Sequence, residues 1–131
     1  MGYALSTTVR RPFAEALAAT RSALSDQGFG ILTEIDLAAT MKAKLDVDLP
    51  PQVILGACRP PLALAALQAE PSIGLLLPCN VVVRADGDDR SIVSALNPQV
   101  MVTIPEREDL RPVADEAGQR IRAALDALTA A

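Results

Sequence analysis

Two proline pairs bracket a continuous apolar run in this chain, residues 52–58, which reads QVILGAC. Pro50 with Pro51 precedes the run, and Pro60 with Pro61 follows it. Proline lacks a backbone N–H and cannot occupy the middle of a sheet or a helix, so each pair marks an element boundary. An apolar run between such boundaries is typical of a central strand buried on both faces. We therefore expect residues 52–58 to form the centre of a sheet.

Strand and helix patterns alternate before this run. Residues 3–9 predict a strand, and Pro12 suits the first turn of a helix that ends at Gly28. Residues 30–36 predict a second strand with Ile31, Thr33 and Ile35 on one face and Glu34 on the other. Asp36 can cap a helix over residues 37–45.

The pattern continues after the run. Residues 62–69 predict an apolar helix, and residues 79–84 and 91–96 predict two strands joined by a hairpin. Residues 100–104 predict a short edge strand. The clearest helix covers residues 110–128, where apolar side chains recur every three or four positions.

The resulting order is β-α-β-α-β-α-β-β-α. Helical crossovers favour a substantially parallel sheet, and the hairpin adds an antiparallel pair. We therefore expect one α/β domain over residues 1–131, a compact two-layer structure with a mixed sheet.

Half of the 131 residues are hydrophobic, yet only 2% are aromatic. The core must therefore consist of Ala, Leu, Val and Ile. A surplus of apolar side chains without a membrane-spanning segment suggests that a partner covers some of them, and a homodimer is the simplest such arrangement.

The net charge is −4, and no basic stripe is interleaved with aromatic residues, so we expect no nucleic-acid partner. The amino end has no apolar signal region, and the longest nearly uncharged stretch contains Glu70 and Pro71, so we expect no membrane span. These features favour a cytoplasmic protein whose two cysteines are free thiols.

The chain contains no histidine. This excludes Ser–His–Asp and Cys–His catalysis, histidine as a general base and every histidine-ligated metal site. We expect neither a metal nor a cofactor.

Cys58 ends the central strand and lies directly before a predicted helix. Free backbone N–H groups and the positive end of the helix dipole would stabilise a thiolate there. The alternative is that Cys58 is a small, inert core residue. Cys79 begins the next strand, so the two sulfurs come close only if the two strands are antiparallel.

Two polar residues complete the candidate ligand-binding set of Glu34, Cys58, Cys79 and Asn80. Glu34 lies within a predicted strand. A carboxylate in this position can line a pocket, or it can face solvent or pair with a basic residue. Asn80 can orient a ligand carbonyl, or it can bond the backbone where its strand begins.

The sequence resembles the bacterial and archaeal family called domain of unknown function 302. The resemblance extends from about the first helix to Pro98 and rests on four segments in order: GFG at 28–30, TEID at 33–36, GAC at 56–58 with Pro60 and Pro61, and LLPCN at 76–80. It implies a compact α/β fold and dimers. It implies no activity.

The favoured hypothesis is a dimeric module that binds a small molecule in a pocket near the two cysteines. The alternative is a thiol-dependent enzyme, for sulfur transfer or redox chemistry, with Cys58 as nucleophile. A third hypothesis is a structural or regulatory protein whose apolar surplus forms an interface. No catalytic residue is assigned.

Overall fold

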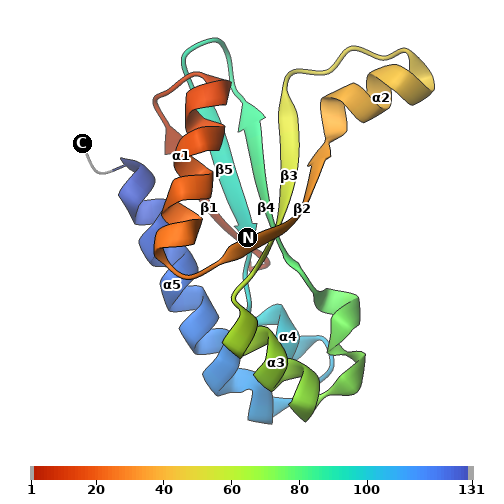
Figure 1. Ribbon diagram of the computed structural model, residues 1–131, viewed down its shortest axis with the longest axis vertical. Helices are drawn as coiled ribbons and strands as arrows, with labels where there is room; N and C mark the ends of the chain where they lie inside the picture. Colours follow the sequence, from red (N-terminus) through yellow and green to blue (C-terminus); the bar gives the residue numbers. More distant parts are fainter. Residues whose placement is uncertain (1, 130–131) are drawn as a thin grey trace.

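The computed structural model describes residues 2–129 and contains one five-stranded sheet (Figure 1). Its strands lie in the order β1-β5-β4-β3-β2, and every neighbouring pair is antiparallel. Their bounds are β1 (Ala4–Val9), β2 (Gly30–Asp36), β3 (Gln52–Cys58), β4 (Cys79–Ala85) and β5 (Ser91–Leu96). The predicted order of the main elements is confirmed, and so is the α/β class.

The expected parallel pairing was wrong, because the sheet is entirely antiparallel rather than mixed. The helix α1 (Phe13–Asp26) connects β1 to β2, which run in the same direction but form opposite edges of the sheet. The helices α2 (Leu37–Leu45) and α3 (Pro60–Ala69) connect antiparallel neighbours. Each of these two helices therefore lies beyond an end of the sheet, as Figure 1 shows, instead of crossing its face.

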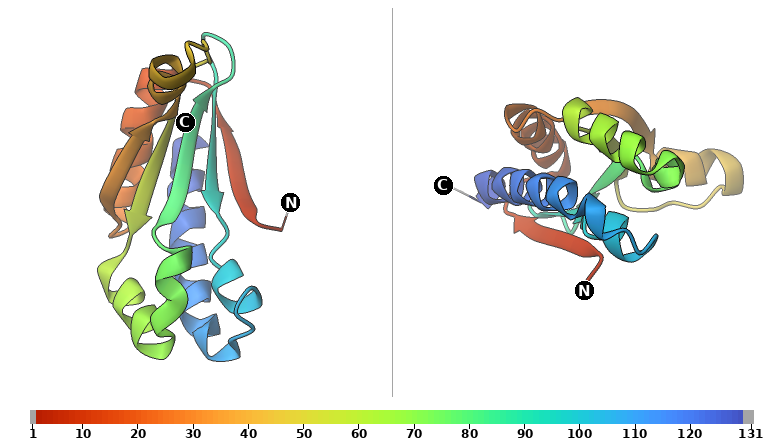
Figure 2. Two further views of the ribbon diagram at one scale, coloured as in Figure 1. Left: turned by 90° about the vertical axis from the view of Figure 1, so that its right-hand side faces the viewer. Right: turned by 90° about the horizontal axis from the view of Figure 1, so that it is seen from below.

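One face of the sheet is covered by α1 and by the long helix α5 (Arg111–Thr129), which gives two layers (Figure 2). The core between the layers includes Leu24 of α1, Leu55 of β3 and Ile121 of α5, all at most 2% exposed. The opposite face carries no helix in the described part of the chain. Ile54 of β3 is accordingly only half-buried, so the central strand is not buried on both faces as expected.

A second hydrophobic cluster lies beyond the end of the sheet at which β3 ends and β4 begins, which is the lower end in Figure 1. It joins α3, the 3₁₀ helix η1 (Pro71–Leu76), the short helix α4 (Val100–Thr103), the 3₁₀ helix η2 (Glu108–Leu110) and the start of α5. The edge strand expected at residues 100–104 was wrong, because α4 occupies this position. Met101 and Val102 are adjacent and both buried, which a helix allows but the alternating faces of a strand do not.

A β-bulge between Ile31 and Thr33 changes the faces of β2. Ile31 pairs with Ala57 and Glu34 pairs with Leu55, so both point to the helix-covered face. The expected grouping of Ile31 with Thr33 and Ile35 was therefore wrong. The predicted cap of α2 is confirmed, since Asp36 accepts a hydrogen bond from the Ala39 N–H at 2.9 Å. None of the helices formed by residues 2–129 is both long and apolar enough to cross a membrane.

Candidate functional site

The two cysteines lie at the same end of the sheet, because β3 and β4 are antiparallel. Ala57 at the end of β3 pairs with Cys79 at the start of β4, and Cys58 is the next residue. Both cysteines are free thiols and line one cavity. The sequence analysis expected the two sulfurs to come close only if their strands were antiparallel, and the strands are antiparallel.

This cavity, called here the thiol cavity, lies between the lower end of the sheet and the second hydrophobic cluster. Apart from the cysteines and Arg59, its lining is apolar and comes from α3, η1, α4, α5, the sheet ends and the adjoining loops, including Phe29, Leu62, Ala66, Leu96, Met101 and Ile121. Its volume of about 40 Å³ has room for about three water molecules. It can therefore accept only a small ligand or one end of a larger ligand.

Cys79 is a partly buried thiol that is neutral near pH 7. Its Sγ donates a hydrogen bond to the Leu96 carbonyl at 3.3 Å. Burial, and secondarily the charge of Cys58, raises the pKa of Cys79 to about 12. Cys79 therefore carries no thiolate near neutral pH.

Cys58 lacks the environment that the sequence suggested for a thiolate. Pro60 and Pro61 form the first turn of α3 and have no N–H, and the N–H groups of Leu62 and Ala63 both donate to the Arg59 carbonyl at 3.0 Å. The first turn of α3 thus has no free donor for a sulfur anion. Burial raises the pKa of the Cys58 thiol, which opposes the expected activation.

Arg59 is a site residue that the sequence analysis did not identify. It is the N-cap of α3 and lines the thiol cavity. Its Nη1 pairs with the Glu116 Oε2 of α5 at 3.2 Å, whereas its Nε is buried without a hydrogen-bond partner among the described residues. The sequence does show a basic residue between the cysteine that ends β3 and the proline pair that begins α3. Its ion-pair partner Glu116 is 57 positions away, so this pairing could not be read from the neighbouring residues.

Gly28 makes room for the Arg59 side chain. Gly28 has φ +83°, and a Cβ added there would lie 3.0 Å from the Arg59 Nε. A side chain at this position would be strained and would also press on the guanidinium. Gly28 was predicted to end a helix. In the structure it also leaves the space that the Arg59 side chain occupies.

Neither Glu34 nor Asn80 is among the residues that line the thiol cavity. Glu34 forms an exposed ion pair with Arg21 of α1, the alternative considered from the sequence. Asn80 is exposed and pairs with Gly56 on the open face of the sheet. Of the four candidate residues, the structure brings Cys58 and Cys79 together at one cavity.

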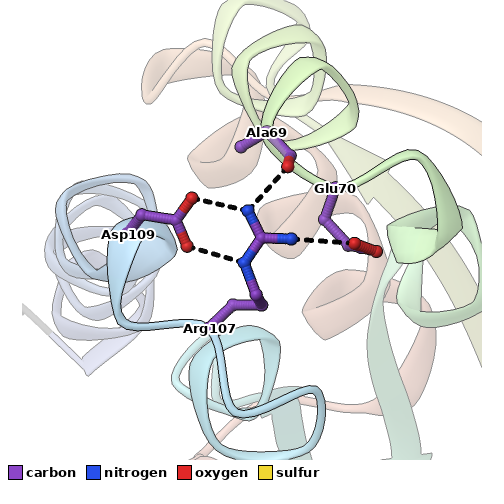
Figure 3. Close-up of polar contacts among 4 residues, drawn as sticks. All are labelled: Ala69, Glu70, Arg107 and Asp109. Carbon is purple, nitrogen blue, oxygen red and sulfur yellow. Dashed lines mark hydrogen bonds and ion pairs between the residues drawn. The ribbon is translucent and has the colours of Figure 1, made fainter.

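Arg107 ties the segments around the thiol cavity together (Figure 3). Its guanidinium forms two hydrogen bonds to the Asp109 carboxylate, at 2.9 and 2.6 Å, and one to Glu70 at 2.8 Å. It also donates to the carbonyl of Ala69, the last residue of α3, at 2.8 Å. This contact set joins the end of α3 to the segment before η2 and so supports one wall of the cavity.

We expect Arg107→Met to lower the melting temperature and to speed amide hydrogen exchange at the end of α3. The reason is that Glu70, whose side chain is only 23% exposed, would lose its partner. The matched control is Arg111→Met, since Arg111 pairs with the more exposed Glu108. Equal effects of the two substitutions on melting would contradict this role for Arg107.

A larger hollow of 520 Å³ lies along α5, with Leu5 and Asn97 on its other side. It is a shallow groove open to solvent, and its walls include the exposed charged residues Arg122 and Asp126. Neither cysteine lines this groove, whereas both cysteines and Arg59 line the thiol cavity. The thiol cavity is therefore the better candidate site despite its smaller volume.

Comparison with known proteins identifies a family and a fold. The family model described as "Domain of unknown function DUF302" matches residues 5–128. A crystal structure of an uncharacterized conserved DUF302 protein from Bacillus stearothermophilus superposes with a TM-score of 0.89 and 24% sequence identity. The match covers 98% of this chain and 99% of that one, and at this identity it establishes the fold alone. No curated protein matches the chain.

Proposed function

This chain belongs to the DUF302 family, and we propose that it is a small-molecule-binding domain whose ligand enters the thiol cavity. One observation carries the proposal: the cavity has an apolar lining that also includes Arg59 and the two free thiols. Small-molecule sites typically have such a composition, an apolar surface with a few convergent polar groups. The free thiols are consistent with a reducing compartment, and we place the function in the cytoplasm.

The thiol environment favours binding over thiol catalysis. A nucleophilic cysteine needs a lowered pKa, whereas the pKa values of Cys58 and Cys79 are both raised. Cys79 also uses its S–H to bond the Leu96 carbonyl. Both cysteines then serve as small, polarizable lining of the cavity.

The test is a thermal-shift screen with a library of small organic molecules against the wild type and Ala66→Val. Ala66 is fully buried and lines the cavity, so the larger side chain should reduce the space for a ligand. At a concentration of 100 times its Kd, a ligand should raise the wild-type melting temperature by about 10 °C. The same ligand should give a much smaller shift with Ala66→Val.

Ala39→Val is the matched control for this screen, because Ala39 is an exposed residue of the distant helix α2. Its ligand response should equal that of the wild type. Circular dichroism shows whether each variant is folded before the comparison is made. The proposal fails if no compound stabilises the wild type, or if a folded Ala66→Val responds as the wild type does.

We also propose that two copies associate through the edge of the sheet formed by β2, α2 and residues 46–51. Helix α2 has no buried residue and extends away from the rest of the molecule (Figure 1). Large apolar side chains are exposed along this region, namely Leu32, Ile35, Leu45, Val47 and Leu49. The backbone groups on the outer edge of β2 are also free to pair. A second copy would bury both features.

Sedimentation velocity at micromolar concentration tests this association. We expect the wild type to sediment as a dimer and Leu45→Asp as a monomer, because a carboxylate in an apolar interface is strongly unfavourable. Leu75→Asp is the control, since Leu75 is 89% exposed on η1, outside the proposed interface. A monomeric wild type, or a Leu45→Asp variant that remains dimeric, would refute the proposed interface.

A further inference from the structure

We propose that the part of the ligand held in the thiol cavity is an uncharged alkyl group of about three carbon atoms. This inference rests on the proposed function and names the class of ligand. Three features of the cavity support it: its polar side chains offer few hydrogen bonds, its one charged residue is already paired, and its volume is small.

The polar side chains of the lining offer a ligand little hydrogen bonding. They belong to Cys58, Arg59 and Cys79. The Cys79 Sγ donates to the Leu96 carbonyl at 3.3 Å, and the Arg59 Nη1 donates to the Glu116 Oε2 at 3.2 Å. The Arg59 Nε is enclosed by protein atoms, so a molecule in the cavity does not reach it. Cys58 remains, and a neutral thiol is only a weak hydrogen-bond donor.

The charge of the lining also disfavours an ionic ligand. Near pH 7 both cysteines are neutral, because burial raises the pKa of Cys58 and of Cys79. Arg59 is the one charged residue of the lining, and its guanidinium pairs with Glu116. An ion that entered the cavity would lose its hydration without gaining a partner there. The ligand group inside the cavity is therefore uncharged.

The surface and volume of the cavity match an alkyl group. Ala66, Met101 and Ile121 are buried and supply apolar surface, and Leu62 is a half-buried part of the wall. The sulfur atoms of Met101 and of the two cysteines are polarizable, so they add dispersion attraction to an apolar group. The volume of about 40 Å³ holds about three groups of the size of a water molecule or a methyl group.

The experiment is a titration of the full chain with dissolved n-alkanes from methane to butane, followed through methyl resonances in a ¹H–¹³C NMR spectrum. The Met101 methyl resonance, assigned by its absence in Met101→Leu, reports binding in the cavity. Affinity should rise by about fourfold for each carbon up to propane. Butane should bind no more than about twofold more tightly than propane, because three carbons fill the cavity.

An alkyl group of this size can be a whole small molecule or the end of a longer chain. Titration with 1-hexanol separates these two sources. Binding of 1-hexanol as tight as that of propane shows that the cavity admits the end of a chain. Binding of propane without binding of 1-hexanol shows that the cavity holds a whole small molecule. Either result supports the alkyl class.

Propionate and propylammonium test the requirement for an uncharged group. Each should bind at least about a hundredfold more weakly than propane. Leu62→Ala tests the size limit, because the carbons that it removes enlarge the cavity. In this variant butane should bind at least about threefold more tightly than propane. The matched control is Leu64→Ala, which should keep the wild-type series, since Leu64 of the same helix is 57% exposed and lies outside the lining.

Failure of this inference can be told apart from failure of the proposed function. If propionate or propylammonium binds as tightly as propane, the cavity binds ligands but the uncharged class is wrong. If library compounds shift the Met101 resonance and no alkane does, the alkyl class is wrong while the binding function stands. A folded Leu62→Ala variant that keeps the wild-type series would place the alkanes elsewhere and overturn the inference. If no alkane and no library compound binds, the binding function itself is refuted.

Discussion

Replacing Gly56 with valine is expected to lower the free energy of unfolding by about 3 kcal/mol, at the upper end of the usual cost of overpacking. Gly56 is buried in β3, and a Cβ added there would lie 2.1 Å from the Thr33 Oγ1 and 2.8 Å from the Pro78 Cγ. The threonine side chain can rotate away, but the proline ring is rigid. The neighbouring strand and the entry to β4 must therefore shift.

Urea denaturation monitored by circular dichroism measures this effect. Gly56→Ala should cost less than valine because only the Cβ is added, and combining it with Thr33→Ala should restore part of the loss. The control is Gly118→Ala in α5, where a Cβ meets no atom within 4 Å. This substitution should stabilise the helix by roughly 0.5–1 kcal/mol. A Gly56→Val variant as stable as the wild type would show that the proposed packing of Thr33 and Pro78 is incorrect.

The second large effect concerns pH, through Cys79. Its pKa is about 12 in the folded protein, compared with an ordinary value of 9.0. Above pH 9 the unfolded chain loses the thiol proton while the folded chain keeps it, so the stabilisation present below pH 9 decreases as pH rises toward 12. Each unit between the two values corresponds to about 1.4 kcal/mol, so stability at pH 11 should be about 3 kcal/mol lower than at pH 8.

Few other groups obscure this effect, because the chain has only two lysines, Lys42 and Lys44, and one tyrosine. The raised pKa of Cys58 acts in the same direction, and so does that of Lys42, which is raised by Asp46 and Asp48. Denaturant unfolding under reducing conditions should show a much flatter pH dependence for Cys79→Ala. Lys42→Met is the control and should retain most of the slope. An unchanged slope in Cys79→Ala would contradict the assignment.

Alkylation supplies an independent measurement of the same property. A pKa of about 12 instead of 9.0 leaves about a thousandth of the thiolate at pH 8. Cys79 in the folded protein should therefore react with iodoacetamide about a thousandfold more slowly than it does in the denatured chain. Mass spectrometry of peptides containing Cys58 or Cys79 measures the two rates separately. Equal rates in folded and denatured protein would show that the fold does not hold Cys79 as a neutral thiol.

At the candidate site, the sequence predicted the position of Cys58 but not the role of Arg59. The position of Cys58 between a strand and a helix was predicted correctly. Its expected activation failed because Pro60 and Pro61 remove two N–H groups from the first turn of α3, a property that the sequence itself contains. The contacts of Arg59 with Glu116 and Gly28 join residues that are distant in sequence, so the local pattern around Arg59 does not reveal them.

The sequence by itself determined the order of strands and helices, the cap at Asp36 and the long final helix, because hydrophobic periodicity, capping and proline constraints act over a few residues. Only the tertiary structure decided that β1 and β2 lie at opposite edges of an antiparallel sheet, and that α4 replaces an expected strand. The same long-range pairing brought Cys58 and Cys79 to one cavity with Arg59. The physical reason is that strand pairing depends on contacts among side chains far apart in the chain, which local patterns do not encode.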